Sequence, residues 1–312
     1  MMFPASGHDP IRHKIEALSS QLSLPTVRKA LGILEGEHPS GKRGSGYDYE
    51  GIRTYEAGDE ARLIDWASSA RMGRPMVAEH ERLVTSKAWL FIDMGREMQA
   101  TTASSESAAA VAANALRMFA SLSLRRSDEV SLVTANKQAI TRIPSQGGFA
   151  AFDQTLDKAL DRSWSQPRNI TAMLEYALRI PDRQSLIVIA TDETAIGEQH
   201  LAAIKKIAQT HPLIVVSVAT LNPLSPTNGF AHILDGVSKR QVPAFMRQEM
   251  AAQEVDTHRH YQNSALKRDL VRTGATLIHA HSSQSMFNEF VRILSAASLI
   301  STSGSSLMGG LR

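Results

Sequence analysis

The chain contains no cysteine, which excludes disulfide bonds and thiolate metal sites. Aromatic residues make up only 5%, and the basic residues form short, scattered clusters. Because nucleic-acid-binding surfaces usually combine a basic stripe with aromatic side chains, we expect no nucleic-acid partner. The longest apolar runs, at 186–190 and 213–219, are far shorter than the roughly 20 residues of a membrane-spanning helix. No apolar stretch of signal-peptide length begins the chain, so we expect no membrane span and a cytoplasmic location.

The common fingerprints of nucleotide binding and serine hydrolysis are also missing. No G-x-G-x-x-G follows a predicted strand, and no G-x-x-x-x-G-K-[ST] or G-x-S-x-G segment occurs. Hydrophobic residues make up 43% and charged residues 21%, with a formal net charge of +3, as in ordinary globular proteins. The composition thus indicates a folded protein and gives no sign of an enzyme.

The second part of the chain alternates short apolar runs with amphipathic stretches, a pattern that predicts an α/β fold with a mostly parallel sheet flanked by helices. The segment 11–35 reads as helical, with a break near Pro25. The predicted strands are 89–93, 129–134, 138–143, 186–190, 213–218 and 275–280. The predicted later helices are one capped by Ser104 or Ser105 and ending near 124, one opened by Gly147–Gly148, one capped by Asn169, and three over about 198–209, 242–272 and 285–297.

The segment 45–80 carries the most specific pattern: an aromatic pair, then G-x-R-x-Y, G-D-x-x-R-x-I-D-W and S-A-R. Its fixed positions are Tyr47, Tyr49, Gly51, Arg53, Tyr55, Gly58, Asp59, Arg62, Ile64, Asp65, Trp66, Ala70 and Arg71. This pattern resembles the signature of the bacterial DUF58 proteins. The resemblance implies a von Willebrand factor A-like, Rossmann-type domain over 86–298, preceded by a helical and short-strand DUF58 extension over 1–85. We expect the tail 299–312 to be disordered.

The signature residues also have a reading from their chemistry alone. Gly58 and Asp59 form a turn dipeptide, and alternating arginines and aspartates offer bidentate ion pairs that would lock an irregular segment. Trp66 would supply an apolar anchor. We favour such a structural clasp, with a docking surface for a partner as the open alternative. The residues concerned are Arg53, Tyr55, Gly58, Asp59, Arg62, Asp65, Trp66 and Arg71.

The resemblance also implies a divalent-cation site at the carboxyl edge of the sheet, with ligands D-x-S-x-S, a threonine and a further aspartate. Asp93 keeps the first position, Gly95 and Glu97 replace the two serines, Arg168 stands where the threonine is expected, and Asp192 keeps the last position. Two outcomes follow. Either Arg168 fills the site by pairing with these carboxylates, or Glu97 becomes a ligand and Mg²⁺ or Mn²⁺ binds in an altered geometry. We favour the first, in which Arg168 replaces the metal or contacts an acidic side chain of a partner directly, and we expect no cofactor.

Two histidine pairs invite a metal interpretation that we do not favour. His258 and His260 face different directions on a helix, and no third ligand is evident near His279 and His281. The acids Asp93, Glu97, Asp128 and Asp192 offer an alternative, a metal-dependent hydrolase.

The resemblance implies a function as well as a fold. It implies a non-enzymatic adaptor of a MoxR-type AAA+ ATPase, which presents an unknown client protein during assembly or maturation of complexes. A self-associating structural protein is a third possibility.

Overall fold

The computed structural model describes residues 10–35, 48–56, 64–81, 87–226, 233–235 and 240–305. The chain divides into two compact units. The larger comprises Met1–Glu37 and Ser86–Arg312, and the smaller comprises His38–Thr85. The N-terminal helices therefore belong with the α/β unit, which differs from the predicted boundary at residue 85.

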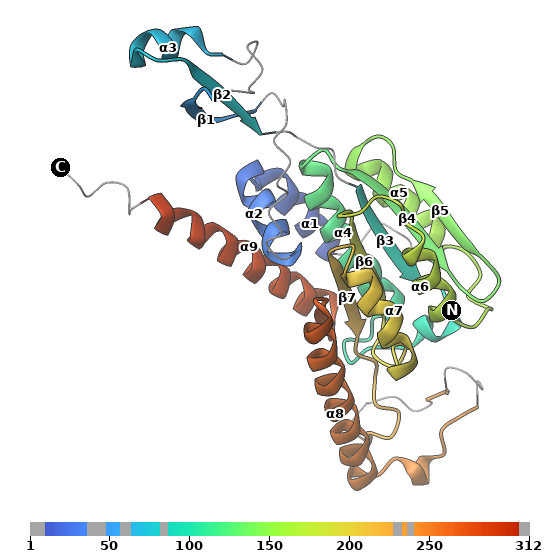
Figure 1. Cartoon of the computed structure of the whole chain (residues 1–312). Helices are drawn as coiled ribbons and strands as arrows, with labels where there is room; N and C mark the ends of the chain where they lie inside the picture. The colour runs from blue at the N-terminus through green and yellow to red at the C-terminus, as the bar shows by residue number, and fades with distance from the viewer. Residues whose placement is uncertain are drawn as a thin grey trace. The chain divides into compact units, whose positions relative to one another are not determined.

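The larger unit is built on a six-stranded sheet in the order β5-β4-β3-β6-β7-β8, in which only β5 runs antiparallel to its neighbour (Figure 1). The predicted mostly parallel α/β sheet is confirmed. Both β6 and β7 are buried along their whole length, because helices cover both faces of the sheet. The strands are β3 (Lys87–Asp93), β4 (Glu129–Ala135), β5 (Ile140–Pro144), β6 (Leu186–Asp192), β7 (Leu213–Val218) and β8 (Thr276–Ala280).

One face of the sheet packs against α4 (Ala108–Arg125), α5 (Gly148–Leu160) and α9 (Ser283–Ser305). The two N-terminal helices, α1 (Pro10–Gln21) and α2 (Leu24–Glu35), join the same core through fully buried residues such as Ile15 and Leu31. Because α4 is rich in alanine, neighbouring elements can approach it closely, and most of its side chains are buried. This face holds the larger of the two hydrophobic cores.

The opposite face packs against α6 (Ile170–Leu178), α7 (Glu198–Ala208) and α8 (Glu249–Thr273). Asn169 caps α6 as predicted, since its side chain accepts a hydrogen bond of 3.0 Å from the Ala172 amide. Gly274 ends α8 in the left-handed conformation that glycine favours, at φ 86°.

Three helix ends differ from prediction. Ser107 caps α4 in place of Ser104 or Ser105, because Ser105 lies at φ 66° in a preceding turn while Ser107 accepts the Ala110 amide at 3.1 Å. The helix expected from about 242 begins at Glu249, after Pro243 and the short 3-10 helix η4 (Ala244–Met246). Finally, α9 continues to Ser305, so the start of the predicted disordered tail is helical, and residues 306–312 lie outside the described residues.

The smaller unit contains an antiparallel pair, β1 (Asp48–Thr54) and β2 (Met76–Glu81), with α3 (Trp66–Met72) between them in the sequence. The Asp65 side chain caps α3 by accepting the amides of Ala67 and Ser68 at 3.0 and 3.1 Å. These hydrogen bonds, first that from the Ser68 amide, lower the pKa of Asp65. Gly73 ends α3 at φ 64° and turns the chain into β2.

Candidate functional site

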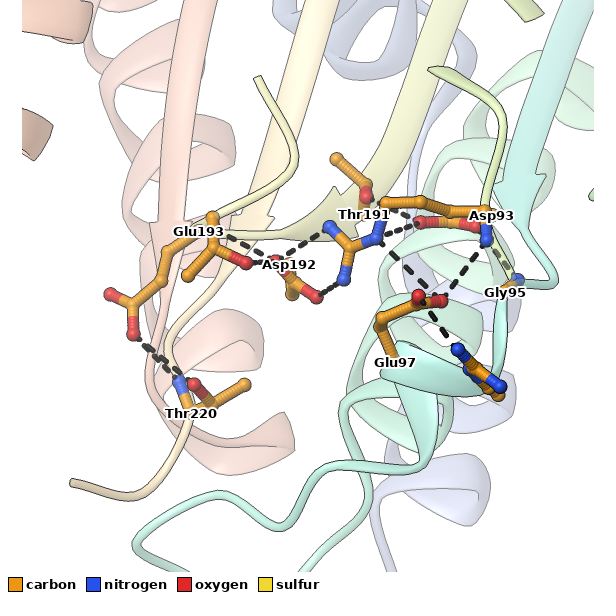
Figure 2. Close-up of polar contacts among 10 residues, drawn as sticks. Asp93, Gly95, Glu97, Thr191, Asp192, Glu193 and Thr220 are labelled. Atoms are coloured by element: carbon orange, nitrogen blue, oxygen red, sulfur yellow. Dashed lines mark hydrogen bonds and ion pairs between the residues drawn. The ribbon is translucent and has the colours of Figure 1, made fainter. Parts of the chain in front are cut away.

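Two aspartates end adjacent parallel strands on the same edge of the large sheet. Asp93 is the last residue of β3 and Asp192 the last residue of β6. Both are almost fully buried, at 1% and 4% exposure. Figure 2 shows them facing a common space together with Glu97, which comes from the 3-10 helix η2 (Arg96–Gln99) after β3. The sequence predicts this gathering of three carboxylates.

A single arginine occupies the space between these carboxylates. Arg168 Nη1 donates to Asp192 Oδ1 at 3.0 Å, and Nη2 donates to the other oxygen of Asp192. Arg168 Nε lies 3.8 Å from Asp93 Oδ2 and 3.8 Å from Glu97 Oε2. All three guanidinium nitrogens therefore face carboxylates of the chain itself, and the two Nη atoms form a bidentate pair. The predicted placement of Arg168 among the three acids is present in the structure.

The backbone at Gly95 explains why a serine ligand has no room at this position. A Cβ on Gly95 would lie 2.6 to 2.7 Å from Cβ, Cα and N of Arg168. The loop that carries Arg168 is fixed there by backbone hydrogen bonds, from the Arg96 amide to Gln166 O at 2.8 Å and from the Lys137 amide to Pro167 O at 2.9 Å. The Arg168 amide itself donates to Glu97 Oε2 at 3.0 Å. A side chain at position 95 and the present position of the Arg168 loop therefore exclude each other.

Asp93 has an unusual electrostatic environment. Burial raises its pKa to about 6, even though the charge of Arg168 and hydrogen bonds from the Gly95 amide and the Thr191 hydroxyl act in the opposite direction. These hydrogen bonds measure 2.8 Å each. Arg168, which lies among three acids, has its pKa raised. The ion pairs of Arg168 do not fully offset the cost of desolvating Asp93.

The turn after β6 extends the polar site. Thr194 donates to Asp192 Oδ1 through both its amide and its hydroxyl, each at 2.7 Å. The neighbouring Glu193 accepts from the Thr220 amide at 3.1 Å and from Arg259 of α8 at 3.2 Å. Asn263 donates to its second oxygen at 3.2 Å. The roles of these residues did not follow from the sequence. The one feature that could have indicated them is the polar run Thr191–Thr194 after an apolar strand.

The site does not have the arrangement that a divalent cation needs. Within the described part of the chain, no group of three or more histidine, aspartate or glutamate side chains is arranged to hold a metal ion. Hard cations take oxygen ligands that converge on one point, whereas here the guanidinium lies between the carboxylates. The residues present therefore do not fit Mg²⁺ or Mn²⁺ in this conformation.

Asp128 and the two histidine pairs are the other residues for which the sequence suggested metal chemistry. Asp128 precedes β4 and pairs with Arg126, so it lies at the opposite edge of the sheet from the strand-end acids. It cannot complete a hydrolase cluster with them. The rings of His279 and His281 pack edge to face, with 4.6 Å between their centroids. Burial lowers the pKa of His279. His258 and His260 lie on α8.

The structure describes part of the signature segment. Trp66, expected as its apolar anchor, begins α3 and is 72% exposed. Arg53 donates to the backbone carbonyl of Thr54 and Arg71 to that of Ala67. Tyr55 donates its amide to Pro75 O at 2.9 Å. Gly58, Asp59 and Arg62 lie outside the described residues.

The fold and site together define a mixed α/β protein with an arginine-filled acidic site at the carboxyl edge of its sheet. The family "Protein of unknown function DUF58" matches residues 51–264, and the chain belongs to this family.

The chain is also similar to individual known proteins. Uncharacterized proteins of Mycobacterium bovis and Mycobacterium tuberculosis are 27% identical over 213 residues, which is 66% of this chain and 65% of theirs. The crystal structure of an aerotolerance-related membrane protein from Bacteroides fragilis, with multiple mutations to serines, is 15% identical at a TM-score of 0.41. The match covers 68% of this chain and 99% of the Bacteroides fragilis chain. Among the described residues here, no helix is both long and apolar enough to span a bilayer.

Proposed function

We propose that this chain is a non-enzymatic protein-interaction module of the von Willebrand factor A-like class, in which Arg168 replaces the metal ion. By family resemblance, its partner is a MoxR-type AAA+ ATPase in the cytoplasm, and its role is that of an adaptor in the assembly or maturation of complexes. The β3 and β6 aspartates at one edge of a mostly parallel sheet support the von Willebrand assignment.

The observation that carries the proposal is the complete engagement of the Arg168 guanidinium. A metal ion in such a site keeps an open coordination position that a partner's carboxylate can fill. Here every guanidinium nitrogen already faces Asp93, Glu97 or Asp192. Partner binding is therefore independent of divalent cations. It also does not depend on an acidic side chain that binds Arg168, because three carboxylates surround this one cation and would repel a fourth.

A calorimetric titration of the purified chain with Mg²⁺ and Mn²⁺ tests the arginine-filled site. We expect no stoichiometric binding to the wild-type chain. Arg168→Thr removes the guanidinium and leaves three carboxylates, so this variant should gain measurable affinity for divalent cations. Tight, stoichiometric binding to the wild-type chain that is lost in Asp93→Ala contradicts the proposal.

Co-purification with the ATPase tests the partner. The chain is immobilised, and a nucleotide-free MoxR-type ATPase is passed over it with EDTA and then with Mg²⁺, so that the ATPase's own need for Mg²⁺–nucleotide does not intervene. We expect the same recovery in both buffers. No recovery in either buffer refutes the partnership, whereas recovery only with Mg²⁺ refutes the metal-independent interface.

A further inference from the structure

The first half of α8 presents large apolar side chains to solvent. Met250 is 82% exposed and Tyr261 is 68% exposed. Just before the helix, Phe245 of η4 is 75% exposed. Isolated apolar residues on a surface need no explanation, but a contiguous group of them marks an interaction site. Residues 240–250, orange in Figure 1, lead away from the sheet and into α8.

Met250 and Tyr261 belong to one hollow, which we call the α8 groove. Its volume is about 890 Å³, and the residues that define it here are Thr194, Met250, Glu254, His258, Arg259 and Tyr261. Met250, Glu254 and Tyr261 are spaced by four and seven residues, so they lie along one side of α8. A surface that follows one side of a helix over three turns fits another helix laid beside it.

The run from Gln248 to His258, at the start of α8, carries charge of one sign. Between Gln248 and His258 the chain contains Glu249, Glu254 and Asp256, all exposed, and no lysine or arginine. Arg259, which lines the groove among the described residues, is paired with Glu193. Arg247 precedes the acidic run and is half-buried, so the exposed charges from 248 to 258 are acidic.

The groove also adjoins the acidic site. Thr194 lines the groove and donates two hydrogen bonds to Asp192, the carboxylate that Arg168 binds. At that site three carboxylates face Arg168, and Arg96 Nε lies 4.0 Å from Glu97 Oε1, so three acids against two arginines leave one net negative charge at this end of the sheet.

We infer that the α8 groove binds a basic amphipathic helix of a partner protein. The partner's apolar side chains pack on Met250 and Tyr261, and its lysines or arginines pair with Glu254 and Glu249. This inference rests on the proposed function, because it gives the chemistry of a partner segment at the same end of the module. The net charge of the whole chain is +3, so affinity for a cationic helix requires this local acidic surface and is not an effect of overall charge.

The test uses a fluorescein-labelled synthetic helix of about 18 residues, with leucine on one face and lysine on the other. A matched peptide carries glutamate in place of lysine. Fluorescence anisotropy with the full chain is expected to show binding of the lysine peptide that weakens with added salt, and at least about tenfold weaker binding of the glutamate peptide.

Variants locate the binding surface. Met250→Ser, Tyr261→Ser and Glu254→Lys should each weaken binding of the lysine peptide about fivefold to tenfold. The matched controls are Val271→Ser, an exposed apolar residue of α8 outside the groove, and Glu175→Lys, an exposed acid on α6. Both should leave the affinity unchanged, and circular dichroism verifies that every variant is folded.

Equal affinity for the two peptides, or equal losses in the groove variants and the controls, overturns the inference. The same holds if neither peptide binds. If the ATPase is recovered in EDTA but the lysine peptide does not bind, only the groove inference fails. If the lysine peptide binds at the groove but no ATPase is recovered, the proposed partnership fails and the groove remains.

Discussion

At the scale of single residues, Arg168 supplies the positive charge that lies between three clustered carboxylates. Three carboxylates at strand ends repel one another unless a positive charge lies between them. A metal ion supplies that charge and remains exchangeable, whereas a covalently attached guanidinium is always present and always charged. Its planar, bidentate contact with Asp192 also fixes the turn after β6, to which Thr194 adds two hydrogen bonds. Arg168 thus links the ends of β3 and β6 with η2 through its contacts to Asp93, Asp192 and Glu97.

The raised pKa of Asp93 predicts a pH dependence of stability. The folded-state pKa of about 6 lies above the ordinary aspartate pKa of 3.8, so the folded chain binds more protons than the unfolded chain between these two pH values. The free energy of unfolding should therefore fall as pH rises from about 4 to about 6, by up to about 3 kcal/mol from this group. Asp93→Asn, which cannot ionise, should lack this contribution in urea unfolding at several pH values. Exposed Asp161→Asn is the control, and identical pH profiles for wild type and Asp93→Asn would contradict the prediction.

Gly95 gives a steric prediction. Gly95→Ser places a Cβ 2.6 to 2.7 Å from Arg168, including two of its backbone atoms, so the loop must shift. We expect a loss of about 2 kcal/mol in the free energy of unfolding. The matched control is Gly32→Ala in α2, where an added Cβ meets no atom within 4 Å. This substitution should stabilise the helix by about 0.5 kcal/mol. Chemical denaturation measures both, and a neutral Gly95→Ser would show that the close approach is not rigid.

The positions of the acids and of Arg168 at the carboxyl edge of the sheet could be predicted from the sequence. Parallel strands bring their carboxyl ends to one edge, so Asp93 and Asp192 follow from the positions of two apolar runs. The roles of Gly95, Thr191 and Thr194 did not follow, because they depend on a close backbone approach and on hydroxyl directions within a turn. No periodicity in a sequence records such contacts.

At the scale of elements, hydrophobic runs predicted every strand of the large sheet, whereas the ends of helices were less predictable. Ser104, Ser105 and Ser107 are equivalent by composition, and only the turn at Ser105 decides that Ser107 caps α4. Pro243 delays the start of α8. Strands are specified by burial over several residues, whereas a cap depends on one dihedral angle.

A buried ion-pair network joins three helices of the larger unit. Arg117 of α4 contacts Asp153 and Asp157 of α5 at 2.6 Å each, and Arg12 of α1 contacts Asp153 and Asp157 from the other side. Asp153 is buried, and Arg117→Met leaves Arg12 as its remaining cation, so the free energy of unfolding should fall by about 2 kcal/mol. Exposed Arg292→Met, which breaks only the surface pair with Glu289, should change little. Equal effects of the two substitutions in thermal or urea unfolding would refute a stabilising role for the network.

At the scale of the whole molecule, the signature segment 45–80 and the residues that build the acidic site belong to different compact units. The signature predicted the family but placed the domain boundary after residue 85, because helix, signature and sheet follow one another in the sequence. Packing groups them differently. Ile11, Ile15, Val27 and Leu31 of the N-terminal helices are buried in the core beneath α4 and α9.

This grouping predicts opposite results for two deletions of similar size. Replacing His38–Thr85 with a Gly-Ser linker of about ten residues removes the smaller unit and should leave the larger unit folded, with circular dichroism and a cooperative thermal transition close to those of the full chain. Deleting residues 1–37 strips α1 and α2 from the core and removes Arg12 from the ion-pair network, so this variant should lose its cooperative transition or aggregate. If instead the linker variant unfolds and the N-terminal deletion remains stable, the signature unit would be an integral part of the α/β fold. The lysine peptide gives a second readout, because the linker variant retains the complete α8 groove and should bind it as the full chain does.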